Sequence, residues 1–195
     1  MIRKSLLALA GACALTMSAS AVTYSQLSVD GQLADGWSLV FSPIDLTLFY
    51  PEAFAGDLSP TRQGDIDVKF VASDPSGITM VSLTWMGALE GLGSFHMRGT
   101  IEDFTDSNNP IQIGAFDFSV LDHSELPSTR HVAIAPTTVI RITHAITLSA
   151  PDQTDPSGLD IAALTLTDHT FQVVPEPASI IGLALGAAAL IRRRR

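Results

Sequence analysis

Five histidines are the side chains of this sequence best suited to acid–base or metal chemistry, but their spacing favours neither. No two of them form a His-x-His pair, and the single cysteine, Cys13, lies near the N-terminus, far from all of them. The sequence also contains no Gly-x-Ser-x-Gly motif, no His-Glu-x-x-His motif and no glycine-rich phosphate loop. We therefore expect no catalytic centre, no metal site and no cofactor. The histidines are His96, His123, His131, His144 and His169.

His144 is the histidine whose surroundings the sequence indicates best. It alternates in phase with the apolar residues Ile142 and Ile146, which places it on the buried face of a strand. This pattern predicts a core imidazole with a hydrogen-bonded ring, and the alternative is a ligand site shared with His169.

Two acidic loops offer oxygen ligands for calcium. Asp152, Asp155 and Asp160 lie in one loop, and Asp103 and Asp106 lie in the other. Neither loop has the ligand spacing of an EF-hand, and aspartates are also common in turns. We therefore expect solvated turns, with calcium binding as the alternative.

Aromatic side chains offer a different chemistry, because they can stack on sugar rings. The candidates are Trp37, Trp85, Tyr24 and Tyr50. Trp85 alternates with polar residues and is predicted to lie in the core, whereas Trp37 follows the Asp35-Gly36 turn and is the one expected to be exposed.

Alternating apolar and polar residues predict that these side chains are carried by β-strands. The pattern covers residues 66–72, 79–85, 95–101 and 140–148, and no long helical period occurs between them. Many short strands separated by turn residues are typical of an all-β fold, here a β-sandwich with Greek-key or jelly-roll connections.

Three local features of these strands can also be predicted. Asp-Pro-Ser-Gly occurs at 74–77 and again at 155–158, each time before a strand, and predicts two similar hairpin turns. Residues 51–58 are expected to form one short helical turn. The apolar phase changes between Leu166 and Phe171, which predicts a β-bulge near Asp168.

Length and charge restrict the kinds of partner. The chain has 195 residues, enough for one domain with a real core. Residues 22–175 contain five Lys and Arg against 19 Asp and Glu, a net charge of −14 with neutral histidine. Such an acidic surface repels phosphates, so we expect no nucleic-acid partner.

The N-terminus has the three parts of a secretory signal peptide. Arg3 and Lys4 precede an apolar run from Leu6 to Met17, and Ala19 and Ala21 stand at positions −3 and −1 of a cleavage site before Val22. Residues 1–21 are therefore predicted to be a signal helix that is removed. The alternatives are a lipoprotein signal that uses Cys13 and an uncleaved anchor.

The C-terminus combines a short motif, an apolar run and a basic cluster. Residues 178–191 are apolar except for Ser179, and as a helix they would extend about 21 Å, short for an independent membrane span. The basic cluster should remain in the cytoplasm, which places the body on the outer side of the membrane. The motif is Pro175, Glu176 and Pro177, and the cluster is Arg192, Arg193, Arg194 and Arg195.

This three-part tail resembles the PEP-CTERM sorting signal of Gram-negative bacteria. The resemblance implies that a membrane protease, exosortase, recognises the Pro-Glu-Pro motif and removes the tail. The protein would then pass transiently through the inner membrane to the cell surface or the medium, in company with exopolysaccharide and biofilm matrix. The same tail is also labelled as the C-terminal region of ice-binding proteins, which says nothing about the body. A plain tail anchor is the alternative.

Together these features predict three segments and a function. Residues 1–21 are the signal peptide, 22–174 the secreted β-sandwich and 175–195 the sorting signal. We expect the secreted domain to be a non-enzymatic structural or adhesive component of the extracellular matrix, with extracellular polysaccharide as a candidate partner. A glycan-binding module and a hydrolase without a recognisable motif are the alternatives.

Overall fold

The computed structural model describes residues 21–57, 59–152 and 158–175. Almost all of its regular structure is antiparallel β-sheet, and in this part of the chain the sole helical element is the 3-10 turn η1 (His123–Glu125). The all-β prediction is therefore confirmed, whereas the expected signal helix and C-terminal helix lie outside the described residues. The strands are β1 (Thr23–Asp30), β2 (Ser38–Phe41), β3 (Asp45–Phe49), β4 (Phe54–Gly56), β5 (Gln63–Glu90), β6 (Ser94–Asp103), β7 (Ile111–Val120), β8 (Ser128–Ser149) and β9 (Ile161–Val173).

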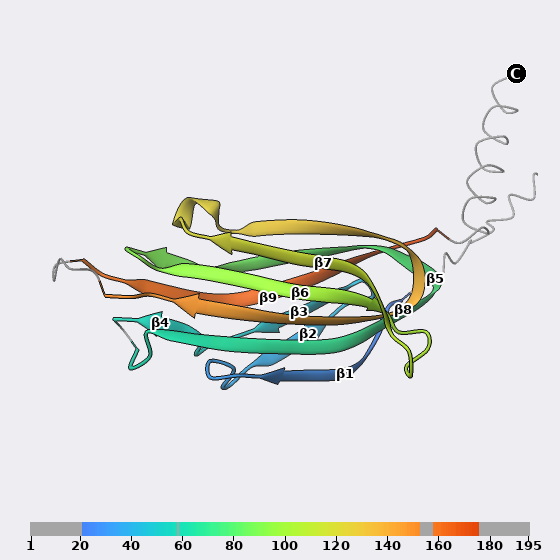
Figure 1. The fold of residues 1–195 in the computed structure, drawn as a ribbon, viewed down its shortest axis with the longest axis horizontal. Coiled ribbons are helices and arrows are strands. Elements are labelled where there is room, and N and C mark those ends of the chain that lie inside the picture. The colour runs from blue at the N-terminus through green and yellow to red at the C-terminus, as the bar shows by residue number, and fades with distance from the viewer. Residues whose placement is uncertain (1–20, 58, 153–157, 176–195) are drawn as a thin grey trace, which may run out of the picture. The chain divides into compact units, whose positions relative to one another are not determined.

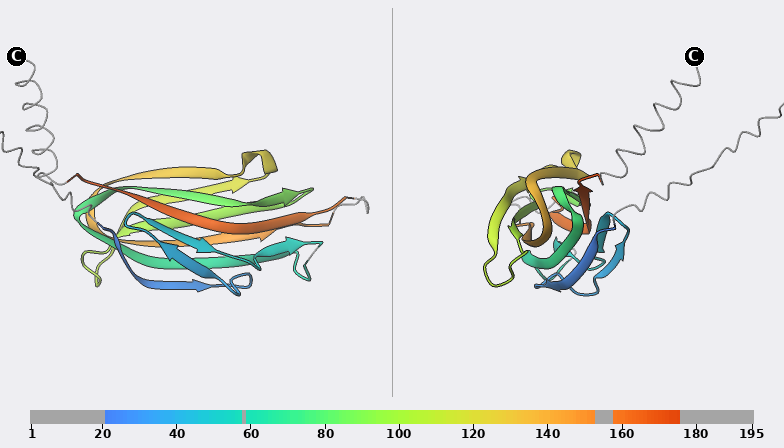
Figure 2. Two further views of the ribbon diagram at one scale, coloured as in Figure 1. Left: turned by 180° about the vertical axis from the view of Figure 1, so that it is seen from behind. Right: turned by 90° about the vertical axis from the view of Figure 1, so that its right-hand side faces the viewer.

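The sheet folds into two facing layers, a sandwich-like arrangement (Figure 1). The two long strands β5 and β8 bend and contribute one half of their length to each layer. Residues 63–73 of β5 pair with β1 and with the second half of β8, which also pairs with β6. Residues 78–90 of β5 pair with β9 and with the first half of β8. The first layer therefore has the order β1-β5-β8-β6-β7 and the second the order β2-β3-β9-β5-β8. Figure 2 shows the body from behind and end-on.

The Asp-Pro-Ser-Gly segment at 74–77 bends β5 and does not form the predicted hairpin. The Ser76 N–H donates to Asp74 Oδ1 (2.8 Å), so the expected local turn is present, and Gly77 has φ of 92°. The register with β8 shifts between Ser73 and Ile78. Because β8 bends beside this segment, both strands pass together from one layer to the other. Most of the second copy, at 155–158, lies outside the described residues.

Two other local predictions are corrected. Residues 54–56 form β4 and pair with Ala163, Ala162 and Ile161 of β9, so no helical turn forms there. The bulge in β9 lies at Thr165, three residues before the predicted site, because Met86 pairs with Leu166 and Gly87 pairs with Leu164. The shift turns the following alternate residues, including Thr167 and His169, toward the core.

The core lies between the two layers and contains the predicted apolar faces. Its buried residues begin at Val22 and end at Phe171. Backbone hydrogen bonds hold both ends of the body: Val22 N–H donates to Pro43 O (2.7 Å), and Val174 N–H donates to Gly77 O (2.9 Å). Residues 21–174 thus form one compact unit with its own core. Within the described segments, no helix combines the length and apolarity needed to cross a membrane.

Candidate functional site

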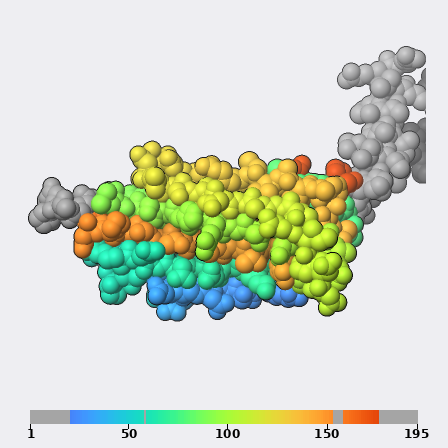
Figure 3. Space-filling view, in the orientation of Figure 1, coloured from blue at the N-terminus to red at the C-terminus, as the bar shows by residue number. Residues whose placement is uncertain are grey.

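A hollow of about 580 Å³ lies on the outer face of the first layer, over strands β5, β8, β6 and β7. Figure 3 shows this face, with β5 in teal, β8 in orange, and β6 and β7 in green to yellow-green. We call this hollow the outer groove. Its lining residues are Asp67, Arg98, Gly99, Thr100, Ala115, Phe116, Asp117, Thr143, His144 and Ala145.

The outer groove arises because short side chains meet in register at the middle of the layer. Arg98 of β6 lies opposite Asp117 of β7 on one side and Ala145 of β8 on the other, and Ala145 lies opposite Asp67 of β5. The next row places Thr143 and Thr100 side by side in the same way. Strands are spaced about 4.8 Å apart, so this row of four strands spans about 14 Å. Asp67 and Asp117 stand at the ends of the first row, and the short side chains of Ala145, Thr143 and Thr100 leave an open trough beside Arg98.

Gly99 shapes the floor of the outer groove. It faces inward on β6, where it pairs with Phe116 and with His144. A Cβ added to Gly99 would lie 2.5 Å from Phe116 Cζ and 2.5 Å from Thr143 O. The Phe116 ring therefore occupies the space that a side chain at residue 99 would need.

The charged side chains of the outer groove differ in how they are bonded. Asp117 Oδ1 contacts Nε2 of His96 at 2.8 Å, which holds one of its carboxylate oxygens in place. Within the described part of the chain, the exposed side chains of Asp67 and Arg98 have no hydrogen bond and no ion pair. One carboxylate and one guanidinium are thus available to a ligand, together with the hydroxyls of Thr100 and Thr143.

A buried histidine pair lies in the core at the level of this groove. Nε2 of His144 lies 2.9 Å from Nε2 of His169, and the two fully buried rings are stacked with centroids 5.1 Å apart. His169 Nδ1 lies 3.2 Å from Leu46 O, a carbonyl that can only accept. His169 therefore carries its proton on Nδ1 and accepts from His144 Nε2–H, which leaves both rings neutral.

Burial fixes this neutral state. It lowers the pKa of His169 to about 4, against the opposing effects of the Leu46 carbonyl and Asp168. Burial, with a smaller contribution from His169, also lowers the pKa of His144 well below its usual value. The prediction of a core imidazole with a hydrogen-bonded ring is confirmed, and its partner is the very histidine named for the alternative ligand site. The two Nε2 atoms bond to each other and neither is available to a metal in this arrangement, while the lone pair of His144 lies on the buried Nδ1, which has no hydrogen-bond partner among the described residues.

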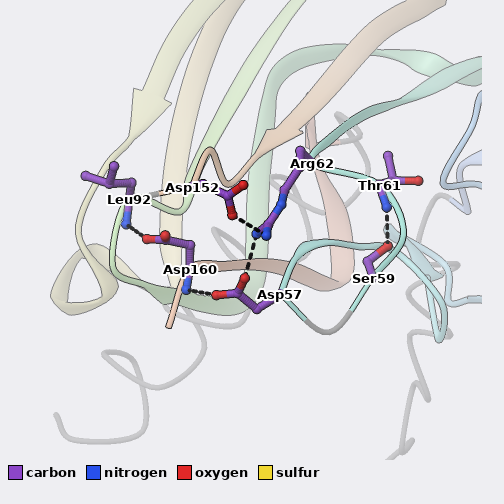
Figure 4. Close-up of polar contacts among 7 residues, drawn as sticks. All are labelled: Asp57, Ser59, Thr61, Arg62, Leu92, Asp152 and Asp160. Atoms are coloured by element: carbon purple, nitrogen blue, oxygen red, sulfur yellow. Dashed lines mark hydrogen bonds and ion pairs between the residues drawn. The ribbon is translucent and has the colours of Figure 1, made fainter. Parts of the chain in front are cut away.

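The acidic loop that precedes β9 forms an ion pair with an arginine of the loop between β4 and β5 (Figure 4). Arg62 Nη1 contacts Asp57 Oδ1 at 2.7 Å, and Nη2 contacts Asp152. The backbone N–H of Asp160 donates to Asp57 Oδ2 (2.7 Å), and this bond, with Arg62, lowers the pKa of Asp57. Asp160 in turn accepts from the Leu92 N–H (2.7 Å). The guanidinium thus joins Asp57 of its own loop to Asp152 of the loop before β9, two carboxylates that a calcium ion there would need, and Asp160 links that second loop to Leu92.

The other acidic loop consists of local turns, as predicted. Asp103 Oδ1 accepts from Thr105 N–H (2.9 Å), which lowers the Asp103 pKa, and Asp106 Oδ1 accepts from Asn108 N–H (3.0 Å). In the described ranges, no three His, Cys, Asp or Glu side chains gather as a metal site would require. Asp155 of the first loop lies outside these ranges.

None of the four candidate aromatic side chains forms an exposed platform. Trp85 is buried as predicted and stacks on Phe118 with ring centroids 4.2 Å apart. Tyr50 is buried and its hydroxyl contacts Thr167 Oγ1 (3.1 Å). The ring of Tyr24 packs against Phe171, and burial raises its pKa. Trp37, expected to be exposed, is partly buried because it packs against the core.

Most of the predicted sorting residues lie beyond the described segments. Pro175 is exposed, two residues after the end of β9, and Ala21 is the exposed residue before Val22. Ala19, Glu176, Pro177 and Arg192–Arg195 are outside the described residues, so their roles stay predictions.

Sequence reasoning did not identify the outer groove or its residues Asp67, Arg98 and Asp117. The alternating pattern indicated that these side chains face solvent, but it carries no information on which strands are neighbours. The same holds for two exposed histidine contacts, His96 with Asp117 and His131 Nδ1 with Ser82 Oγ (2.8 Å).

Comparison with known proteins identifies the tail. Residues 173–195 match the model of the PEP-CTERM protein-sorting motif, which confirms the resemblance found in the sequence. No curated protein matches the chain.

Two solved structures resemble the body at low similarity. One is TmCBM61 in complex with β-1,4-galactotriose, with 11% identity, a TM-score of 0.41, and coverage of 78% of this chain and 90% of that one. The other is the C-terminal domain of a chitobiase from Bacteroides fragilis, with 11% identity, a TM-score of 0.26, and coverage of 74% and 99%.

Proposed function

We propose that this chain is a secreted, exosortase-sorted, non-enzymatic protein that binds extracellular polysaccharide through the outer groove and serves as an adhesive component of the matrix. The sorting motif at residues 173–195 supports export and processing by an exosortase. In this proposal the tail holds the chain in the inner membrane until it is cut, and the body then reaches the surface or the medium.

The observation that carries the proposal is the chemistry of the outer groove. The groove is open and shallow. The carboxylate of Asp67, the guanidinium of Arg98 and the threonine hydroxyls extend into it from paired strands. Polysaccharides offer rows of hydroxyl groups that both donate and accept hydrogen bonds, and the groove residues Asp67, Arg98 and Thr143 supply both kinds of partner.

The separation of the two groove carboxylates favours binding over hydrolysis. Asp67 and Asp117 lie on β5 and β7, three strand spacings apart in one row. Their backbones are about 14 Å apart, and both side chains extend from the same face of the sheet. The paired carboxylates of glycosidases are closer, at about 5–10 Å from each other. Within the described residues, no histidine is hydrogen-bonded to Thr100 or Thr143, so neither hydroxyl has the base that a nucleophile needs.

Binding assays with a groove-filling variant test the proposal. The secreted protein should bind immobilised polysaccharides on a glycan array, and Ala145→Phe should abolish binding because the new ring fills the middle of the groove. Ala133→Phe is the matched control, since residue 133 is an exposed alanine of the same strand in the second layer. Equal binding by the wild type and Ala145→Phe, or no binding of any glycan by the wild type, would refute the proposal.

A further inference from the structure

We infer that the outer groove selects neutral polysaccharides over anionic ones, with Asp67 as the residue that determines this selection. The inference rests on the proposed function and specifies the ligand class for the same site. It follows from the charge and the free hydrogen-bonding capacity of the groove walls.

The walls of the outer groove are net acidic. Arg98 is the single cation among the lining residues, and it is flanked in its own row by Asp117 on one side and by Asp67 across Ala145 on the other. Beyond the lining residues, Asp30 of β1 pairs with Asp67 and the exposed Lys69 of β5 pairs with Thr143, so these two flanking charges offset each other and the lining carboxylates still outnumber Arg98. The body as a whole carries five basic against 19 acidic residues between 22 and 175. A uronate or sulfated chain lying across this row would satisfy Arg98 but would place its charges beside two carboxylates.

Neutral sugars fit these walls without an unfavourable charge contact. Asp67 has no hydrogen bond or ion pair in the described part of the chain, so both of its oxygens can accept from sugar hydroxyls. Asp117 is held through Oδ1 by His96, which leaves Oδ2 as a positioned acceptor. Arg98 then donates to sugar oxygens between them. Hydrogen bonds to an ionised group are the stronger kind, so the acidic walls contribute affinity for hydroxyl donors.

The substitution Asp67→Asn distinguishes the two ligand classes by the sign of its effect. It retains the size of the side chain and removes its charge. For a neutral polysaccharide such as dextran, xylan or a β-glucan, we expect affinity to fall about tenfold, because a charge-assisted hydrogen bond is replaced by a weaker one. For an anionic polysaccharide such as alginate, the same substitution should increase affinity, since it removes a repulsive charge.

Isothermal titration calorimetry measures the affinity of the secreted protein for both classes of polysaccharide. The titrations are made at low salt and at 0.5 M salt, where the screening length is about 4 Å. Asp35→Asn is the matched control, because it changes the net charge equally at an exposed turn residue outside the groove, and it should alter neither affinity. We expect salt-independent binding of a neutral polysaccharide that Asp67→Asn weakens. Wild-type binding of the anionic polysaccharide at least as tight as that of the neutral one, or an Asp67→Asn variant with both affinities unchanged, would overturn this inference; if Ala145→Phe still abolished that binding, the proposed function would stand. No binding in either class would refute both.

Discussion

At the scale of single residues, the buried pair His144 and His169 makes stability depend on pH. Both pKa values are lowered by burial, that of His169 to about 4, so in the range between about 6.5 and about 4 the unfolded chain binds protons that the folded chain does not. Stability is therefore complete above pH 6.5 and is lost progressively as the pH falls toward 4. A shift of this size at His169 alone corresponds to roughly 3 kcal/mol. Urea unfolding midpoints measured from pH 7.5 to pH 4 should show this loss.

A double substitution separates this effect from other acid-sensitive groups. His144→Leu/His169→Leu should flatten the curve between pH 6.5 and 4, whereas His123→Gln/His131→Gln, which removes two exposed histidines, should leave its slope unchanged. The carboxylates with lowered pKa values, such as Asp57 and Asp103, lose their stabilising contribution only below their usual value of 3.8, outside this window. A slope that persists in the first double variant would contradict the assignment to the buried pair.

At the scale of the strand, Gly99 determines how β6, β7 and β8 fit together. Gly99→Ala should lower the free energy of unfolding by about 1–3 kcal/mol, because the methyl group meets the Thr143 carbonyl of the paired strand, which cannot move away. Gly114→Ala on β7 is the control, since its new Cβ would meet side-chain atoms and no backbone atom, at 3.1 Å from Val132, 3.4 Å from Ile134 and 3.5 Å from Ile101. Thermal melts of both variants test this prediction, and the melting temperature of Gly99→Ala should be the lower of the two. Equal melting temperatures would mean that the groove floor tolerates a side chain.

At the scale of the whole molecule, folding and sorting should depend on separate parts of the chain. The backbone hydrogen bonds of Val22 and Val174 lie at the two ends of the body, and Glu176 follows the second of them. Glu176→Ala should therefore leave the melting temperature of the body unchanged. The same substitution should slow removal of the tail. Intact-mass measurement in a host with exosortase should find a mature chain that starts at Val22 and lacks the residues after the Pro-Glu-Pro motif. Glu125→Ala is the control for loss of one acidic charge and should be processed normally. A secreted species that retains Arg192–Arg195, or a body unfolded by Glu176→Ala, would contradict this separation.

Several features of this protein depend on local order along the chain, and the sequence alone determined them. Alternation over residues 66–72 and 95–101 identified strands and their buried faces, because successive side chains of a strand point to opposite sides wherever the strand lies. The tail was recognisable for a similar reason, since its motif, apolar run and arginines are read in order. Turn chemistry was less decisive. The Asp74–Gly77 segment has the hydrogen bond of a turn, yet whether it reverses a strand or only bends it depends on the neighbouring strand β8.

Only the tertiary structure decided which distant residues meet. The outer groove exists because Asp67, Ala145, Arg98 and Asp117 share one row across four strands, and the register of those strands is set by packing of the whole sheet. The position of the bulge at Thr165 turns His169 inward toward His144, and a shift of one residue would have placed it in solvent. A sequence specifies the face that each side chain occupies within its strand, whereas neighbours across strands follow from long-range pairing that no local pattern records.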